Sequence, residues 1–230
     1  MSSILSLLRR SLLDVVPRDH REAPAVLRRR QLVTAGFAVL GALVLGVSLR
    51  IEPGNGWFYP ATVALAAVWV IGSFASGRLH LGWIGGGSGV VRPVLAPVLV
   101  GLLLAGLFVV GALVVRQVPY LGDRVAGVLG YTDEGSRTVL LLIAGLNGVA
   151  EELFFRGAVY AAVTRRPVLW TTLGYTAVTL ATGNVMLALA AAVLGLVVGL
   201  ERRASGGILA PVLTHVTWSA VMLLVLPPLF

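Results

Sequence analysis

Four ionisable side chains lie inside long apolar stretches of this sequence. Glu151, Glu152 and Arg156 share the segment GVAEELFFRG, and His215 lies in PVLTHVTWS. An ionisable side chain at the centre of a membrane-spanning helix costs about 2.5–3.5 kcal/mol on insertion scales, so such residues are functional candidates by default. Their grouping predicts that the chemistry of this protein takes place among these four side chains.

The spacing of the two glutamates predicts a different role for each. Glu152 and Arg156 lie one helical turn apart, so we expect them to pair and to offset the cost of each other's burial. Glu151 points roughly 100° away and gains no partner from that pair. Asn147, one turn earlier, lies on the face of Glu151 and is expected to orient it. Glu151 is therefore suited to take a proton from water and pass it to a leaving group.

A second polar face is predicted in the last apolar stretch. His215 and Ser219 lie one turn apart, and hydrogen-bond donors on this face could stabilise an oxyanion. A carboxylate base and facing donors are the parts that hydrolysis requires. The alternative is structural: the glutamates with Arg156 would form an ion cluster that ties helices together, and His215 would bond a neighbouring carbonyl.

Both segments resemble motifs of a known family. EELFFR matches the EExxxR motif of the CPBP intramembrane proteases (the CAAX-protease and bacteriocin-processing family, also called Abi). GGILAPVLTHVTWS resembles that family's last motif, an apolar run that ends in HxxxN or HxxxD. The resemblance covers roughly residues 138–226. It implies a bundle of about eight helices around a membrane-embedded cavity.

The same resemblance implies roles for the candidate residues. Glu151 would activate the water, with support from Glu152 and Arg156. His215 would contribute to the oxyanion site. The family has no well-established cofactor, and two Glu and one His make a thin zinc shell. We therefore expect a reaction without a metal, and a divalent metal ion is the open alternative.

The sequence departs from the family's pattern at two places. The middle motif, FxxxH, is expected within residues 168–184, which contain no histidine; Thr182 and Asn184 are the nearest candidates for its role. A polar stripe at helical spacing follows the same run and would keep the site hydrated: Tyr175, Thr179 and Thr182. The last motif ends in Ser219 instead of Asn or Asp. A hydroxyl donates one hydrogen bond but does not replace an imidazole as a proton carrier.

Composition restricts the class of protein that can hold these residues. The 230 residues are 57% hydrophobic and only 12% charged, with a mean hydropathy of +0.93. So little charge cannot cover a water-exposed surface, which excludes a soluble globular enzyme. The apolar runs are continuous, without the alternation of an outer-membrane barrel. The prediction is an all-α, polytopic membrane helix bundle with about 7–8 transmembrane helices.

Seven apolar runs supply these helices. They are residues 32–49, 57–76, 93–115, 138–164, 168–184, 185–200 and 207–226. The fourth is too long for an upright span and should tilt or extend beyond the membrane. The fifth and sixth are short and are expected to form a helical hairpin or a partly re-entrant pair. In the sixth, Ala191, Gly195 and Gly199 are spaced four apart, which permits close helix packing.

The basic residues indicate orientation and partners. All 18 are arginine, and the net charge is +8. Thirteen arginines would lie on the same side of the membrane as the N-terminus, and four would lie on the opposite side. Arg156 would lie inside a membrane-spanning helix. This bias predicts a multi-pass protein of the cytoplasmic membrane with its N-terminus inside and its C-terminus outside. The expected partners are the lipid bilayer and a membrane-associated peptide or protein substrate; nucleic acid is not expected.

Three regions are predicted along the chain. Residues 1–31 would be a cytoplasmic, amphipathic and basic segment, residues 32–137 the N-terminal membrane helices and loops, and residues 138–226 the CPBP/Abi-like core. Within the first region, residues 3–16 place their apolar side chains on one helical face, so an interfacial helix ended by Pro17 is expected. A disordered basic tail is the alternative. His20 and His80 are expected to be solvated loop side chains.

Several classes of function compete for this pattern. The favoured prediction is an intramembrane endopeptidase in which a glutamate activates the water. A catalytically impaired membrane scaffold or self-immunity protein on the same fold is the main alternative, because the middle-motif histidine is missing. A proton-coupled transporter would also carry buried Glu and Arg. A rhomboid-like serine protease would use Ser88 of GGSG, but that segment lies outside any apolar run. With no cysteine in the chain, thiol nucleophiles and disulfides are excluded.

Overall fold

The structure is a computed structural model, and it describes residues 2–18, 20, 22–48, 51, 55–86, 89–133 and 136–230. Helices form most of this part of the chain. They are α1 (Ser2–Leu12), α2 (Pro24–Ser48), α3 (Phe58–Ser76), α4 (Leu95–Val115), α5 (Pro119–Asp133), α6 (Arg137–Glu152), the π-helical η1 (Leu153–Val159), α7 (Tyr160–Ala162), α8 (Pro167–Leu180), α9 (Val185–Ser205), α10 (Leu209–Val225) and η2 (Pro227–Leu229). A short hairpin pairs β1 (Ile84–Gly85) with β2 (Val90–Val91). Ser88 lies outside the described residues.

The helices confirm a multi-pass membrane protein with an all-α fold. Each of the seven predicted apolar runs coincides with a helix. Among the described residues, five helical stretches are long and apolar enough to cross a membrane. They are Pro24–Ser48, Phe58–Ser76, Leu95–Val115, Arg137–Ala162 and Val185–Ser205. This number is below the predicted one because two of the runs form shorter helices, the 14-residue α8 and the 17-residue α10.

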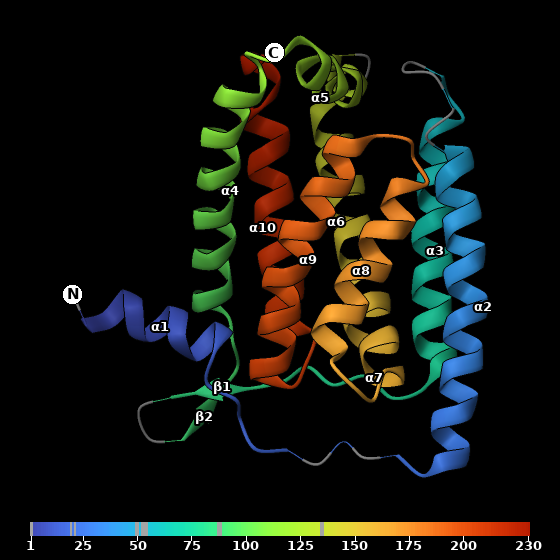
Figure 1. The fold of residues 1–230 in the computed structure, drawn as a ribbon, viewed down its shortest axis with the longest axis vertical. Coiled ribbons are helices and arrows are strands. Elements are labelled where there is room, and N and C mark those ends of the chain that lie inside the picture. The colour runs from blue at the N-terminus through green and yellow to red at the C-terminus, as the bar shows by residue number, and fades with distance from the viewer. Residues whose placement is uncertain are drawn as a thin grey trace.

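The stretch that carries the glutamates lies at the centre of the bundle. Figure 1 shows α6 behind α8 and α9, with α10 and α4 on one side and α3 and α2 on the other. Helices α6 and η1 pack against α3, and α6 also packs against α10. Helices α8 and α9 form the helical hairpin, which was one of the two predicted forms. Helices α3, α8, α9 and α10 therefore surround the stretch that carries the predicted chemical centre.

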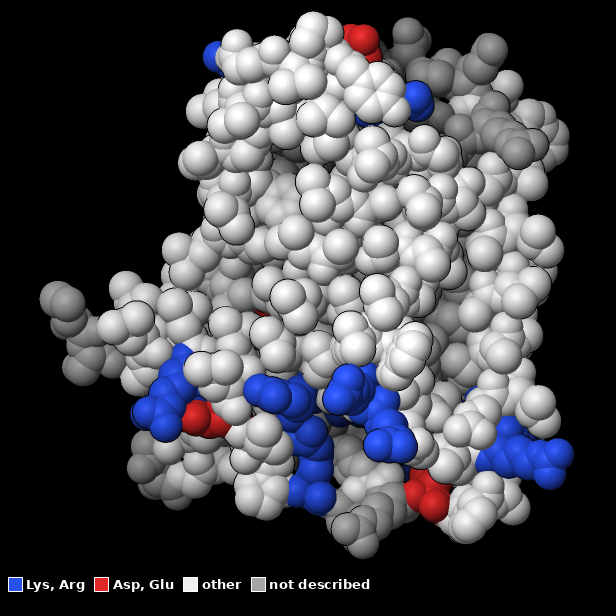
Figure 2. Space-filling view, viewed as in Figure 1, with Lys and Arg blue, Asp and Glu red and all other residues white. Residues whose placement is uncertain are grey.

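One end of the bundle, called here the Arg-rich end, carries most of the described arginines. Helix α2 begins there, α8 begins there and α9 ends there (Figure 1). Figure 2 shows blue basic side chains across this end, below a broad and mainly white band. The distribution matches the predicted segregation of arginine to one side of the membrane.

The charged ends of two helices extend further than predicted. Helix α2 begins at Pro24, eight residues before the predicted run, because Arg30 in its second turn is buried against Glu22. Proline at a helix start loses no hydrogen bond. Helix α9 continues to Ser205, five residues past the predicted end, and buries Glu201 and Arg202. Both residues were expected in a loop, but Glu201 accepts a hydrogen bond from Ser11, and Arg202 donates one to the carbonyl of Arg156.

The N-terminal segment is attached to the bundle. Helix α1 ends at Leu12, earlier than the predicted residue 16, and packs against α9 and α4. The hydroxyl of Ser11 donates a hydrogen bond of 2.9 Å to Glu201, and the backbone N–H of Val16 donates to the carbonyl of Ala204. The described part of this segment is therefore a docked helix with an extended continuation, which differs from the disordered alternative.

The long central stretch is interrupted by a π-helical segment that the sequence pattern did not predict. Residues Leu153–Val159 follow Glu152 directly and form the wider i→i+5 turn. Such segments occur frequently at functional sites in helical proteins. Its aromatic residues Phe154 and Phe155 are buried against Trp69 and Tyr175. This aromatic core fixes η1 between α3 and α8.

Candidate active site

Glu152 stands at the centre of a buried ion cluster. One of its carboxylate oxygens, Oε1, accepts a hydrogen bond of 3.1 Å from Arg156 Nη1 and lies 2.8 Å from His215 Nδ1. The side chains of Glu152 and Arg156 are completely buried, and that of His215 is 6% exposed. The pairing of Glu152 with Arg156 follows the one-turn spacing in the sequence. The contact with His215 joins α10 to α6.

Glu151 points to a different side of α6 and has a different partner. Its Oε2 accepts a hydrogen bond of 2.5 Å from the hydroxyl of Tyr175 and lies 4.0 Å from His215 Nε2. The side chain is 20% exposed. The two ring nitrogens of His215 therefore face the two glutamates, one each. Glu151, Glu152, Arg156 and His215 are brought together as the sequence predicted.

Arg156 is held from four directions. Besides Glu152, its Nη2 donates to the carbonyl of Gly195 at 3.1 Å, and its guanidinium lies 4.8 Å from the centre of the Tyr175 ring. Its own carbonyl accepts a hydrogen bond of 2.6 Å from Arg202 Nε. Gly195 permits this approach, since a Cβ at that position would lie only 3.1 Å from Arg156 Nη2. The small-residue spacing predicted for helix packing here also accommodates the arginine.

Two of the other sequence candidates lie away from this cluster. Thr182 lies in the turn between α8 and α9, where its hydroxyl accepts a hydrogen bond from the backbone of Asn184. Asn184 itself caps α9 by accepting from Met186 N–H, and it donates to the carbonyl of Arg124. Both are occupied in forming the hairpin turn, at the end of α8 opposite to the Arg-rich end (Figure 1).

Asn147 and Ser219 lie near the cluster without a bond to Glu151 among the described contacts. The Asn147 side chain donates 3.0 Å to the carbonyl of Ile143, within its own helix. The hydrogen bond to Glu151 that was expected from Asn147 is made by Tyr175 instead. Ser219 lies one turn beyond His215 on α10 and is partly exposed.

Sequence reasoning missed Tyr175 and Arg202 as members of the site. Tyr175 was recognised only as part of a polar stripe on its own helix. Its hydroxyl reaches Glu151 because α8 packs beside η1, a contact that spacing within one helix does not reveal. Arg202 was assigned to a loop because it follows the apolar run directly. The signal for Arg202 was a polar residue at the border of an apolar run, and the signal for Tyr175 was a hydroxyl in the middle of one.

The donor set bears on metal binding. Within the described residues, no group of three or more His, Asp or Glu side chains is arranged to hold a metal ion. The Oε1 atom of Glu152 already contacts a guanidinium and an imidazole nitrogen. A cation at that oxygen would have to compete with Arg156. The metal-free character of the site stays a prediction.

Comparison with known proteins shows what the C-terminal region of the chain is similar to. Residues 134–221 match the model of a family described as type II CAAX prenyl endopeptidase, Rce1-like. The match confirms the predicted resemblance to the CPBP intramembrane proteases, and at the level of the family it supports a protease. It does not favour the scaffold alternative. No curated protein and no solved structure matches the chain significantly.

Proposed function

We propose that this protein is an intramembrane endopeptidase that hydrolyses a peptide bond of a membrane-associated protein or peptide. The observation that carries the proposal is the 4.0 Å separation of Glu151 Oε2 and His215 Nε2 in a largely buried site. This distance is too long for a direct hydrogen bond, and one water molecule can bridge it. Glu151 and His215 would thus hold a water between a base and a hydrogen-bond donor.

The reaction follows from these two groups. Glu151 takes a proton from the water while the water oxygen attacks the carbonyl carbon of the substrate. The oxyanion accepts a hydrogen bond from Nε2–H of His215. Glu151 then passes its proton to the amide nitrogen, the C–N bond breaks and the carbonyl re-forms. The products are a carboxylic acid and an amine.

Glu152 and Arg156 support this chemistry by orienting His215. The 2.8 Å contact between Glu152 Oε1 and Nδ1 fixes the imidazole ring and favours a proton on that nitrogen. The other nitrogen is thereby directed towards Glu151. Arg156 compensates the charge of Glu152, since an unpaired carboxylate at full burial would be strongly destabilising.

Tyr175 supports the proposal from the helix in which the family's middle motif is expected. Its hydroxyl donates one hydrogen bond to Glu151 Oε2, and a carboxylate oxygen keeps a further lone pair that can accept from the water. A phenol orients the carboxylate but does not shuttle protons as an imidazole does. Glu151 must therefore both accept and deliver the proton. The competing scaffold function would require none of these groups to react.

The decisive experiment compares wild type with Glu151→Gln in proteoliposomes. Two probes are supplied, a farnesylated CAAX-type peptide and an unmodified apolar membrane peptide, in water enriched in heavy oxygen. Mass spectrometry then detects new C-termini that carry the label. We expect labelled products from wild type and at least about a hundredfold slower cleavage by Glu151→Gln, because the general base is lost. A divalent chelator in a parallel reaction tests the metal alternative.

A matched control removes a carboxylate elsewhere. Asp123→Asn neutralises an exposed residue on α5 and should cleave at the wild-type rate. Undiminished cleavage by Glu151→Gln would contradict the role of this glutamate. A wild-type protein that cleaves neither probe, yet is folded by circular dichroism, would favour the scaffold function.

A further inference from the structure

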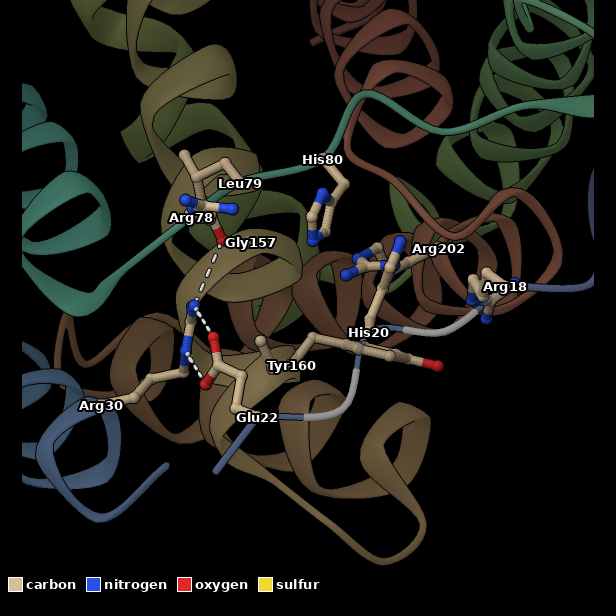
Figure 3. Close-up of a pocket in the computed structure, with 11 residues that line it drawn as sticks. Arg18, His20, Glu22, Arg30, Arg78, Leu79, His80, Gly157, Tyr160 and Arg202 are labelled. Atoms are coloured by element: carbon tan, nitrogen blue, oxygen red, sulfur yellow. Dashed lines mark hydrogen bonds and ion pairs between the residues drawn. The ribbon is translucent and has the colours of Figure 1, made fainter. Parts of the chain in front are cut away.

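A second polar site lies at the Arg-rich end, apart from the ion cluster of Glu151 and Glu152. It is a pocket of about 190 Å³ beneath η1 and α7, drawn in Figure 3. Its polar lining consists of Arg18, His20, Glu22, Arg30, Arg78, His80, Tyr160 and Arg202. These residues come from the N-terminal segment, the start of α2, the loop after α3, α7 and the end of α9. Five separate parts of the chain therefore line this one pocket.

The pocket has an excess of positive charge. Glu22 is the acidic residue in its lining, and both oxygens of this carboxylate bond Arg30, so these two charges cancel. Within the described part of the chain, no carboxylate lies within 4.0 Å of the basic nitrogens of Arg18, Arg78 or Arg202. In the part of the chain that the structure describes, three guanidinium groups thus line one pocket without a carboxylate in contact with them.

The excess of positive charge in the pocket includes a buried side chain, that of Arg202. The residue is only 5% exposed, its Nε is bonded to the carbonyl of Arg156, and its guanidinium lies 4.8 Å from the ring centre of Tyr160. Figure 3 shows this group beside His80 and above His20. A buried cation without a counter-ion is strongly destabilising. An anion in the pocket would supply that counter-ion.

The two histidines of the pocket, His20 and His80, also lie close to its positive charges. The His20 and His80 rings stack with their centres 3.8 Å apart, so they are paired with each other and are not simply solvated as predicted. Partial burial lowers the pKa of His80, and the positive charges of Arg202 and Arg30 lower it further. A ring held in its neutral form can still donate one N–H to an anion.

We propose that this pocket binds the phosphate group of an anionic ligand, carried either by a lipid headgroup or by a soluble phosphate ester. Guanidinium groups bind phosphate oxygens with paired hydrogen bonds, and several of them suit a group with multiple charged oxygens better than a single carboxylate. The Tyr160 hydroxyl and the His80 ring add neutral donors. The proposal does not depend on peptide hydrolysis.

The position of the pocket suits a ligand at a membrane surface. Its lining residues belong to the Arg-rich end, which lies below the mainly white band of Figure 2. Arginine-lined pockets between helices at this level are suited to anionic headgroups. The pocket is open to the outside, so a soluble phosphate ester can also reach it. The two sources share the same recognition chemistry and differ in whether acyl chains contribute.

The experiment measures phosphate binding by the full chain in a neutral detergent. Three probes are offered at one ionic strength: phosphatidylglycerol, zwitterionic phosphatidylcholine and inorganic phosphate, with acetate as the carboxylate comparison. Native mass spectrometry counts retained lipid, and the thermal unfolding midpoint reports binding of the small anions. A lipid ligand gives saturable retention of phosphatidylglycerol over phosphatidylcholine. A soluble ester gives a midpoint increase with phosphate that exceeds the increase with acetate.

Variants separate a built site from diffuse charge. Arg78→Gln removes an exposed lining side chain with no hydrogen bond of its own among the described contacts, and it should weaken binding of the preferred probe at least about fivefold. Arg202→Met tests the buried cation in the same way if it folds. Arg165→Gln removes an exposed arginine at the same end and outside the pocket, so it should leave binding unchanged.

Three results would overturn the proposal. They are failure of both phosphatidylglycerol and phosphate to bind, equal weakening by Arg165→Gln and Arg78→Gln, and a midpoint increase with acetate as large as that with phosphate. Each of these results is distinguishable from failure of the protease proposal, because none of the readouts depends on cleavage. Glu151→Gln should bind the preferred probe as wild type does.

Discussion

The hydrogen bond from Tyr175 distinguishes the surroundings of Glu151 from those of Glu152. Glu152 is enclosed by Arg156 and His215, whereas Glu151 is 20% exposed and has the Tyr175 hydroxyl as its hydrogen-bond donor. A single donor orients a carboxylate while leaving lone pairs for water. The sequence alone predicted the Glu152–Arg156 pair, because both residues lie on one helix. It did not predict Tyr175, since that contact depends on which helices are neighbours.

Tyr175→Phe tests this positioning role. Loss of the hydroxyl leaves Glu151 free to rotate, so we expect kcat to fall about tenfold while KM stays unchanged. Steady-state cleavage of the preferred probe peptide in proteoliposomes provides the measurement. Tyr120→Phe, which changes an exposed tyrosine, is the matched control. An unchanged kcat, or a rise in KM alone, would argue against the assigned role.

Among the elements, α9 joins the two polar sites. It supplies the Gly195 carbonyl to Arg156 and ends with Glu201 and Arg202, which contact α1 and η1. The apolar part of this helix could be predicted from hydropathy. Its last turn could not, because a charged residue after an apolar run is read as a loop unless its buried partner is known.

The close approach at Gly195 gives a prediction for the α8–α9 hairpin. In Gly195→Ala, the new Cβ would lie 3.1 Å from Arg156 Nη2 and 3.3 Å from Thr172 Cγ2. We expect a loss of about 1–3 kcal/mol in unfolding free energy and reduced cleavage, since Arg156 must shift. Gly174→Ala on α8 places its Cβ in open space and should be neutral or slightly stabilising. Thermal unfolding in detergent compares the two. Equal midpoints would contradict the packing argument.

For the whole molecule, the distribution of arginine follows the bundle axis. The count in the sequence predicted this segregation without any knowledge of tertiary contacts, because loops alternate between the two ends. The pocket at the Arg-rich end could not be predicted in this way. Arg18, Arg78 and Arg202 are far apart in the sequence, and the docking of the N-terminal segment on α9 brings Arg18 into the pocket that the other two line.

Orientation in the membrane can be measured directly because the chain contains no cysteine. A single Arg165→Cys substitution should react with an impermeant maleimide only from the cytoplasmic side, and Arg116→Cys only from the outside. The basis is the excess of arginine at the end that holds Arg165. Labelling of intact cells and of inverted vesicles distinguishes the sides. The opposite pattern would reverse the proposed topology.

The π-helical segment Leu153–Val159 also restricts the number of residues that this part of the chain can contain. A π turn is geometrically an α-helix with one residue inserted. Deleting one residue from Leu153–Val159 would allow the stretch to rewind as a regular helix, turning the part before it by about 100° relative to the part after it. Glu151 would leave its place opposite His215, or Tyr160 would leave the basic pocket. Substitutions in this segment are therefore easier to accommodate than a change in its number of residues.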